Sequence, residues 1–476
     1  MTMAPPGHRL DPNLSNRADV VVVGAGLSGL ICADQLRRRG LCVRLLEASE
    51  RWGGRLLGQI TRSGQTIDLG GQWVGANHHH LLGLLDRFGL RRYPTHYEGE
   101  GIFRWQGNNH RGPVEHDFRA SLLFFKPHEL GLPRVEVDEA LALQKTFQEL
   151  TDQVSTQTPW CAPDAEHLDR TSVAEWLDQQ GAGELARYPF SWLTRVGGSG
   201  GFEPYESSLL HLAWSQAAAP QHEMPEAWLV QGGAFQVAGR LASELGDVLQ
   251  LGAPVTAIEQ SAVGVRVMHG DGSWLTAAAG VVAVPPPLRL GIRFEPPLPP
   301  CWTGLLQRSP MGSMVKVLAI YAEPFWRKEG LNGHGVGNLP TLEATVDSSP
   351  PDGPGVLTSF IAGARARAWQ QLGETARRRA VLADLQAWWG PEAAHPEELI
   401  CKNWNQESWS TGGFTSFVSP GAWTSFGAIW RQPHGRVFWA GTEASSRWPG
   451  YCEGALEAGM GAADQVQLLL SRGMSR

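Results

Sequence analysis

A glycine-rich turn between two apolar segments near the start of the chain constrains the fold more than any other feature. Residues 18–23 form a short apolar run rich in valine, and a G-x-G-x-x-G turn follows directly at 24–29. A helical pattern then extends over 27–39, and a second apolar strand over 41–46 ends at Glu47. This order of strand, turn, helix, strand and acid is typical of a βαβ unit that binds a dinucleotide.

Each residue of the turn has a mechanical reason. Gly24 permits the tight turn, Gly26 lets a pyrophosphate approach the backbone, and Gly29 lets helix and strand pack closely. Leu27 and Ser28 open the helix, whose free N–H groups would face the phosphates. The turn therefore predicts a phosphate-binding site at the start of this helix.

Two further motifs distinguish between the possible dinucleotides. Arg51-Trp52-Gly53-Gly54-Arg55 follows the second strand, and Asp68-Leu69-Gly70-Gly71-Gln72-Trp73-Val74-Gly75 comes next. Together with Glu47, these motifs resemble those of the flavin-containing monoamine oxidase family, within the wider flavin amine oxidase and polyamine oxidase superfamily. The resemblance implies FAD as the cofactor and covers nearly the whole chain.

The resemblance also implies which residues contact FAD. The backbone at Val255 would touch the adenine side, and the motif at 68–75 would lie beside the flavin ring. The helix that starts near Tyr451 would aim its positive end at the electron-rich edge of the ring. The cofactor-binding residues expected in this way are Gly24, Gly26, Leu27, Ser28, Gly29, Glu47, Ala48, Arg55, Gly70, Gly71, Gln72, Trp73, Val255, Gly441, Glu443, Gly450 and Tyr451.

Three residues are expected to be catalytic: Lys316, Tyr451 and Phe414. In monoamine oxidases two tyrosines form an aromatic cage before the flavin, and Tyr451 and Phe414 match these positions. Lys316 lies in an alternating segment at 311–317, where a lysine is more often an edge-strand or snorkelling residue. The resemblance instead matches it to a lysine that holds a water against flavin N5, where a cation would favour dioxygen reduction.

One departure from the family concerns the attachment of FAD. In the mitochondrial members a cysteine one position before the cage residue carries the flavin covalently, and Gly413 occupies that position here. Cys452 is expected near the ring but not at the linkage position, and Cys401 is more remote. We therefore predict FAD that is bound non-covalently.

The pattern of segments predicts an α/β fold with an α+β division into two domains. A Rossmann-like FAD-binding domain is expected to interleave with a substrate domain made of a mixed sheet and helices. The expected limits are a flexible N-terminus at 1–17, an FAD-binding domain at 18–80, 231–300 and 401–476, and a substrate-binding domain at 81–230 and 301–400.

The bulk composition excludes several partners. The 476 residues carry a formal net charge of −7 and no basic stripe, which argues against nucleic acid. Six cysteines without a CxxC pair predict reduced thiols and no metal site, and His78-His79-His80 is interpreted as a solvated helix start. The polar N-terminus and short apolar runs predict neither a signal peptide nor a membrane anchor. We expect a cytoplasmic monomer or homodimer.

The predicted reaction is oxidation of a primary amine to an imine, which hydrolyses to an aldehyde and ammonia while dioxygen becomes hydrogen peroxide. Amino-acid oxidases of the superfamily place an arginine just after the double glycine, whereas Gln72-Trp73 stands here. No carboxylate for a polyamine is identifiable, so an aromatic or alkyl monoamine is favoured, with diamines, polyamines and L-amino acids as alternatives. A flavin desaturase or a non-catalytic flavoprotein is the alternative from another class, against which Lys316 and the segment 448–453 argue.

Overall fold

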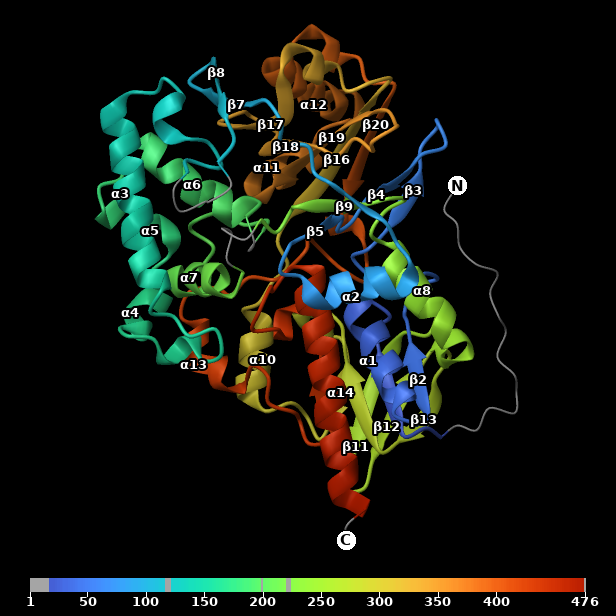
Figure 1. Cartoon of the computed structure of the whole chain (residues 1–476). Coiled ribbons are helices and arrows are strands. Elements are labelled where there is room, and N and C mark those ends of the chain that lie inside the picture. The colour runs from blue at the N-terminus through green and yellow to red at the C-terminus, as the bar shows by residue number, and fades with distance from the viewer. Residues whose placement is uncertain (1–16, 116–120, 198–199, 220–223, 475–476) are drawn as a thin grey trace.

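The computed structural model describes residues 17–115, 121–197, 200–219 and 224–474 (Figure 1). The expected flexible N-terminus lies outside these residues except for Arg17. The predicted α/β fold is confirmed, since the described residues form five sheets together with many helices. Figure 1 shows α1, α8 and α14 beside the strands of the first domain, and α11 and α12 beside those of the second.

A parallel five-stranded sheet lies at the centre of the first domain. Its strand order is β10-β2-β1-β14-β21, and every neighbouring pair is parallel. All four residues of β1 are buried because the strand is paired on both sides and covered on both faces, which explains its run of valines. The bounds are β1 Val20–Val23, β2 Val43–Leu46, β10 Leu249–Gln250, β14 Ala279–Val282 and β21 Val437–Trp439.

The two faces of this sheet are covered by different elements. Val20 and Val22 belong to the hydrophobic cluster of helices α1, α8 and α14, whereas Val21 and Val23 belong to the cluster of a second sheet of order β13-β12-β11-β15. The carboxyl ends of β1 and β2 remain at one edge, where cofactors bind in open α/β sheets. The bounds are α1 Leu27–Arg38, α8 Gln236–Leu245, α14 Cys452–Met474, β11 Val255–Gln260, β12 Val265–His269, β13 Ser273–Ala277 and β15 Arg293–Glu295.

A mixed seven-stranded sheet dominates the second domain. Its order is β20-β16-β19-β18-β17-β7-β8, in which β17 and β7 run parallel and the other neighbours antiparallel. Helices α11 and α12 cover one of its faces. The bounds are β7 Glu100–Trp105, β8 Asn108–Pro113, β16 Met314–Tyr321, β17 Leu331–Gly337, β18 Ala344–Asp347, β19 Gly355–Ala362, β20 Glu398–Asn403, α11 Gly363–Gln370 and α12 Glu374–Trp389.

Further helices form a layer beside this sheet, drawn in teal and green in Figure 1. They are α3 Arg134–Thr151, α4 Ala165–Arg170, α5 Val173–Gln179, α6 Glu184–Arg195 and α7 Leu209–Ala218. The remaining elements are α2 His79–Phe88, α9 Pro286–Arg289, α10 Pro300–Gln307, α13 Ala422–Phe426, β3 Gly58–Ile60, β4 Thr66–Asp68, β5 Trp73–Val74, β6 Arg92–Pro94 and β9 Trp228–Val230.

Strand β16 carries Lys316 into the space between the two domains. The strand lies between β20 and β19, so Lys316 is not an edge-strand residue. Val315 and Val317 belong to the cluster with α12, whereas Leu318 and Ile320 pack with Leu69. Because side chains alternate along a strand, Lys316 shares the face of Leu318 and points toward the segment around residue 69.

A short three-stranded sheet of order β5-β9-β6 connects parts of the chain that are far apart in sequence. It pairs Trp73 with Leu229 and Tyr93 with the same residue. Strand β20, which spans the expected domain limit at 401, belongs to the seven-stranded sheet. The domain limits stay a prediction. Within the described ranges, no helix combines the length and apolarity needed to cross a membrane.

Candidate active site

A cleft opens at the carboxyl ends of β1 and β2, where the glycine-rich turn stands. Gly24 has a φ of 98°, a conformation that glycine adopts without strain. A Cβ on Gly29 would lie 1.9 Å from the Gly24 carbonyl oxygen, so the helix and the turn touch through their backbones. A Cβ on Gly26 would meet nothing within 4 Å, because this residue faces the open cleft. The three glycines thus have the three geometries expected of them.

Most of the expected cofactor-binding residues line this cleft. Glu47 is fixed beside the turn, since its carboxylate accepts hydrogen bonds from the Ala25 N–H at 2.7 Å and the Ser49 N–H at 2.9 Å. Ser28 Oγ accepts a hydrogen bond from the Gly441 N–H at 2.9 Å, which joins the two ends of the chain. The expected residues found in the wall are Gly24, Gly26, Leu27, Ser28, Glu47, Ala48, Arg55, Gly71, Val255, Gly441, Gly450 and Tyr451.

Arg55 is held in one position at the inner end of the cleft. Its guanidinium donates to the Phe414 carbonyl at 2.6 Å and to both carboxylate oxygens of Glu443, at 2.6 and 3.2 Å. Burial opposes the charge on Glu443, but the Arg55 guanidinium outweighs it and lowers the pKa of Glu443. Glu443 therefore lies behind Arg55 and orients it, and the Glu443 side chain stays outside the cleft wall.

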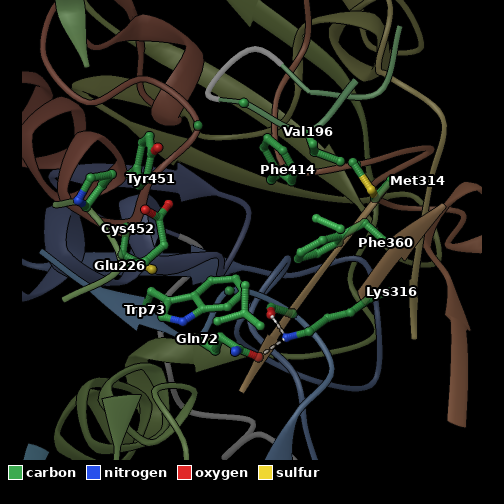
Figure 2. Close-up of a pocket in the computed structure, with 18 of the residues that line it drawn as sticks. Gln72, Trp73, Val196, Glu226, Met314, Lys316, Phe360, Phe414, Tyr451 and Cys452 are labelled. Carbon is green, nitrogen blue, oxygen red and sulfur yellow. Dashed lines mark hydrogen bonds between the residues drawn. The ribbon is translucent and has the colours of Figure 1, made fainter. Parts of the chain in front are cut away.

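A second cavity adjoins the cleft on the side of the seven-stranded sheet (Figure 2). Its wall is largely aromatic and apolar, and it includes Gly70, Gln72, Trp73, Trp192, Met314, Lys316, Val346 and Phe360. The residues that line both the cleft and the cavity are Arg55, Gly71, Phe414, Gly450, Tyr451 and Cys452. A ligand in the cleft and a ligand in the cavity would therefore meet at these residues.

Phe414 and Tyr451 stand at this junction, and both rings are supported from behind. A Cβ on Gly200 would lie 2.2 Å from the Phe414 ring, so the backbone of Gly200 packs directly against it. The Tyr451 ring contacts Trp448 edge-on at a centroid distance of 5.3 Å and His78 at 5.6 Å. These contacts fix two aromatic faces at the boundary of cleft and cavity.

Lys316 is buried at the cavity wall, and its ammonium is surrounded by acceptors. Nζ donates to the carbonyl oxygens of Asp68 and Gly70 at 2.8 Å each, and to Gln72 Oε1. It also lies 5.7 Å from the centroid of the Trp73 ring. Burial lowers the pKa of Lys316 to about 7, against the opposing effect of the Asp68 carboxylate. A small change in its surroundings can therefore add or remove a charge at this point.

Comparison with known proteins decides the family. The family model described as flavin containing amine oxidoreductase matches residues 27–467. The chain belongs to this family. It is an oxidoreductase, and the resemblance noted in the sequence is confirmed.

Individual relatives differ in the substrates that their names give. The chain is 39% identical to an L-amino acid dehydrogenase from Synechocystis sp., over 96% of each chain. It is 33% identical to a probable flavin-containing monoamine oxidase A from Dictyostelium discoideum, over 95% of this chain and 98% of the relative. The structure of cyclohexylamine oxidase from Brevibacterium oxydans matches with a TM-score of 0.88 at 33% identity, over 95% and 99%. Putrescine oxidase bound to putrescine matches with a TM-score of 0.88 at 28% identity, over the same shares.

The histidine run of this amine oxidoreductase differs from the sequence-based interpretation. Helix α2 begins at His79, as expected, and His79 and His80 are exposed. His78, in contrast, is fully buried, and its Nδ1 accepts a hydrogen bond from the Gly75 N–H at 2.8 Å. Burial lowers the pKa of His78 to about 4. The solvated interpretation is therefore wrong for His78, which instead supports Tyr451. Among the described residues no cluster of His, Cys, Asp or Glu could hold a metal ion.

The cysteines are unpaired, and only one of the six lines the cavities. Cys452 lies at the junction, where burial raises its pKa to about 12, so the thiol stays protonated near neutral pH. Gly413 lines the cavity beside Phe414. Cys401 lies on β20, away from both cavities, and burial raises its pKa to about 11.

Sequence reasoning missed one charged residue of the amine oxidoreductase cavity. Glu226 lies in the cavity wall, two residues before β9 (Figure 2). Burial raises the pKa of its carboxyl group to about 7. The pairing of β9 with β5 brings Glu226 to the site, because Trp228 pairs with Val74 next to the cavity residue Trp73. The apolar residues at 228–230 indicate a strand, but only its pairing with β5 shows that Glu226 reaches the cavity.

Proposed function

We propose that this chain binds FAD non-covalently in the cleft and oxidises a primary amine in the adjoining cavity, with dioxygen as electron acceptor. The products are an imine, which hydrolyses to an aldehyde and ammonia, and hydrogen peroxide. The observation that carries the proposal is the junction of the cleft and the cavity at Arg55, Gly71, Phe414, Gly450, Tyr451 and Cys452. Because these residues line both spaces, a cofactor ring and an amine can approach each other there.

The residues of the cleft fit FAD. Gly26 leaves its backbone open to a pyrophosphate, and α1 presents its N-terminus there without an acidic residue in its first turn. Glu47 stands at the end of β2, where an acid can bind ribose hydroxyls. FAD, when bound, supplies the two-electron acceptor and passes the electrons to dioxygen.

The side chains of the cavity would position and desolvate the amine. Phe414 and Tyr451 offer two ring faces at the junction, which can hold the amine beside the cofactor position and exclude water. The neutral form is the reactive one, because a protonated nitrogen has no lone pair to release toward the acceptor. Lys316 would provide a positive charge where dioxygen gains electrons, and its pKa of about 7 lets it exchange a proton there.

Non-covalent attachment is supported by the residues around the ring position. Gly413 offers no nucleophile, and the raised pKa of Cys452 keeps its thiol in the unreactive protonated form. Precipitation of the yellow protein with acid should release all of the FAD into the supernatant. A yellow pellet after washing would contradict this part of the proposal.

The substrate class favoured by the sequence is an aromatic or alkyl monoamine, and the aromatic wall around Trp73 and Phe360 supports an apolar carbon skeleton. Diamines, polyamines and L-amino acids are the alternatives, in line with the different substrates in the names of the relatives. We also propose that the protein is cytoplasmic and is a monomer or a homodimer, as expected from the sequence.

A panel of amines tests the proposed reaction. The FAD-loaded protein is mixed anaerobically with benzylamine, phenethylamine, tryptamine, putrescine, spermidine and several L-amino acids. We expect at least one class to bleach the flavin absorbance and to give hydrogen peroxide when air is readmitted. A spectrum unchanged by every amine would contradict the proposal and favour the desaturase or the non-catalytic flavoprotein.

A further inference from the structure

Glu226 is the one carboxylate among the described residues that line the substrate cavity. The other described charged residues of the wall are Arg55 and Lys316, which are both cationic. Each of these is already engaged, Arg55 by Glu443 and the Phe414 carbonyl, and Lys316 by the carbonyls of Asp68 and Gly70. Neither cation forms an ion pair with Glu226.

The backbone of Glu226 is held firmly in the wall. Its carbonyl oxygen accepts a hydrogen bond from Thr95 Oγ1 at 2.6 Å, and the next carbonyl, of Ala227, accepts one from the Thr95 N–H at 3.0 Å. A Cβ on Gly75 would lie 3.0 Å from the Pro225 Cα, so the preceding residue packs tightly against the loop after β5. The carboxylate is thus presented to the cavity from a fixed position.

The Glu226 carboxylate lacks a counter-charge within the described part of the chain. No other described residue donates a hydrogen bond to it, and no described lysine, arginine or histidine lies within ion-pair distance of it. A carboxylate in a largely apolar wall is costly unless a cation pairs with it. The pKa of Glu226, which burial raises to about 7, expresses this cost. A cationic ligand would remove it.

We propose that Glu226 binds a second cationic group of the substrate, so that the preferred substrates are diamines or other amines with a distal ammonium or guanidinium group. The inference rests on the proposed amine oxidation. It replaces the preference for monoamines, because that preference depended on identifying no carboxylate in the sequence that could bind a polyamine.

The reacting nitrogen itself is a poorer partner for Glu226. That nitrogen must lose its proton before oxidation, and a carboxylate beside it would stabilise the unreactive ammonium form. Phe414 and Tyr451 provide an uncharged place for the reacting end at the junction with the cleft. A second ammonium stays charged throughout the reaction, and in the aromatic cavity it needs the negative charge that Glu226 supplies.

The variant Glu226→Gln keeps the size of the side chain and removes its charge. We expect the apparent affinity of the FAD-loaded enzyme for butane-1,4-diamine to fall by about thirtyfold or more, measured from the concentration dependence of anaerobic flavin reduction. The affinity for butylamine, which lacks the second ammonium, should change by less than about threefold. Glu397→Gln makes the same charge change at an exposed residue outside the cavity and should leave both values unchanged.

Equal losses for the diamine and the monoamine, or no loss for either, would overturn the assignment. A thermal-shift titration under argon with butane-1,4-diamine supplies a second readout that needs no turnover. If no amine reduces the flavin of the unmodified enzyme, the proposed oxidation fails. The inference still stands in that case if the diamine stabilises the unmodified protein but not Glu226→Gln, and it falls if both are stabilised equally.

Discussion

The cofactor cleft and the substrate cavity adjoin each other but are built in different ways. The cleft is formed by backbone and by motifs whose members are neighbours in sequence, such as the turn at 24–29 and the segment at 51–55. The cavity is formed by single side chains from β5, β16, β19 and the loops near 226 and 414. The difference shows that cofactor binding is encoded locally, whereas the choice of substrate depends on how distant segments meet.

The largest effects are expected in the cleft. Substitutions of two glycines there should distinguish an effect on folding from an effect on cofactor binding. Gly29→Ala would place a Cβ 1.9 Å from the Gly24 carbonyl oxygen, so we expect a loss of about 3 kcal/mol or more in stability together with loss of FAD. Gly26→Ala meets no atom within 4 Å and keeps an ordinary backbone conformation, so the apoprotein should fold normally while FAD binds much more weakly. Thermal melting of the apoproteins and the flavin-to-protein absorbance ratio measure the two effects. An unstable Gly26→Ala apoprotein would show that the cleft cannot be separated from the fold in this way.

Lys316→Met should affect one half of the reaction. The variant removes the buried cation of the cavity wall, so we expect reoxidation by dioxygen to slow by about a hundredfold, while reduction by an amine changes by less than about threefold. Stopped-flow absorbance measures both half-reactions separately. Lys316→Arg, which keeps a charge, is the matched control and should retain more of the reoxidation rate. Equal slowing of both half-reactions would contradict the assigned role.

His78, which packs behind the cavity residue Tyr451, should make the free energy of unfolding depend on pH. Its pKa is about 4 in the folded protein and 6.5 in its unperturbed form, so below pH 6.5 the unfolded state takes up a proton that the folded state does not. Its contribution to stability is present above pH 6.5 and is lost as the pH falls toward 4, by up to about 3 kcal/mol. Urea unfolding between pH 7 and 5 should show a shallower decline for His78→Asn, in which an amide oxygen can still accept from the Gly75 N–H. Parallel declines for the two proteins would rule out a buried neutral His78.

Phe414→Tyr is expected to have the smallest effect. The hydroxyl would restore the second tyrosine of the aromatic cage without changing the ring face at the junction. We predict a change of less than about threefold in the rate of flavin reduction, because the faces and not the hydroxyl position the amine. Phe414→Leu, which removes the ring, should slow the reduction much more. A large gain from Phe414→Tyr would show that the missing hydroxyl limits this enzyme.

The sequence predicted the cleft because each of its parts depends on local geometry. A turn that needs Gly24, a helix that begins at Leu27 and a strand that ends before Glu47 can be recognised from spacing alone. Lys316 needed the family resemblance, since the sequence did not show that β16 is an interior strand whose alternate face meets residue 69.

Glu226 and His78 could not be placed from the sequence for a common physical reason. Glu226 reaches the cavity through the register between β9 and β5, and His78 is buried because Trp448 and Tyr451 fold over it from a distant part of the chain. Both are polar residues that lie just before a helix or a strand, and polarity alone suggests exposure. Burial of a polar side chain in such a place follows only from tertiary contacts.

A crystal structure of the FAD-loaded protein with an amine bound under anaerobic conditions tests most directly that cleft and cavity form one site. We predict the flavin ring at the junction beside Arg55 and Gly71, and the reacting end of the amine between Phe414 and Tyr451. A flavin ring that stops short of the junction, or an amine bound away from the two aromatic rings, would contradict the proposal.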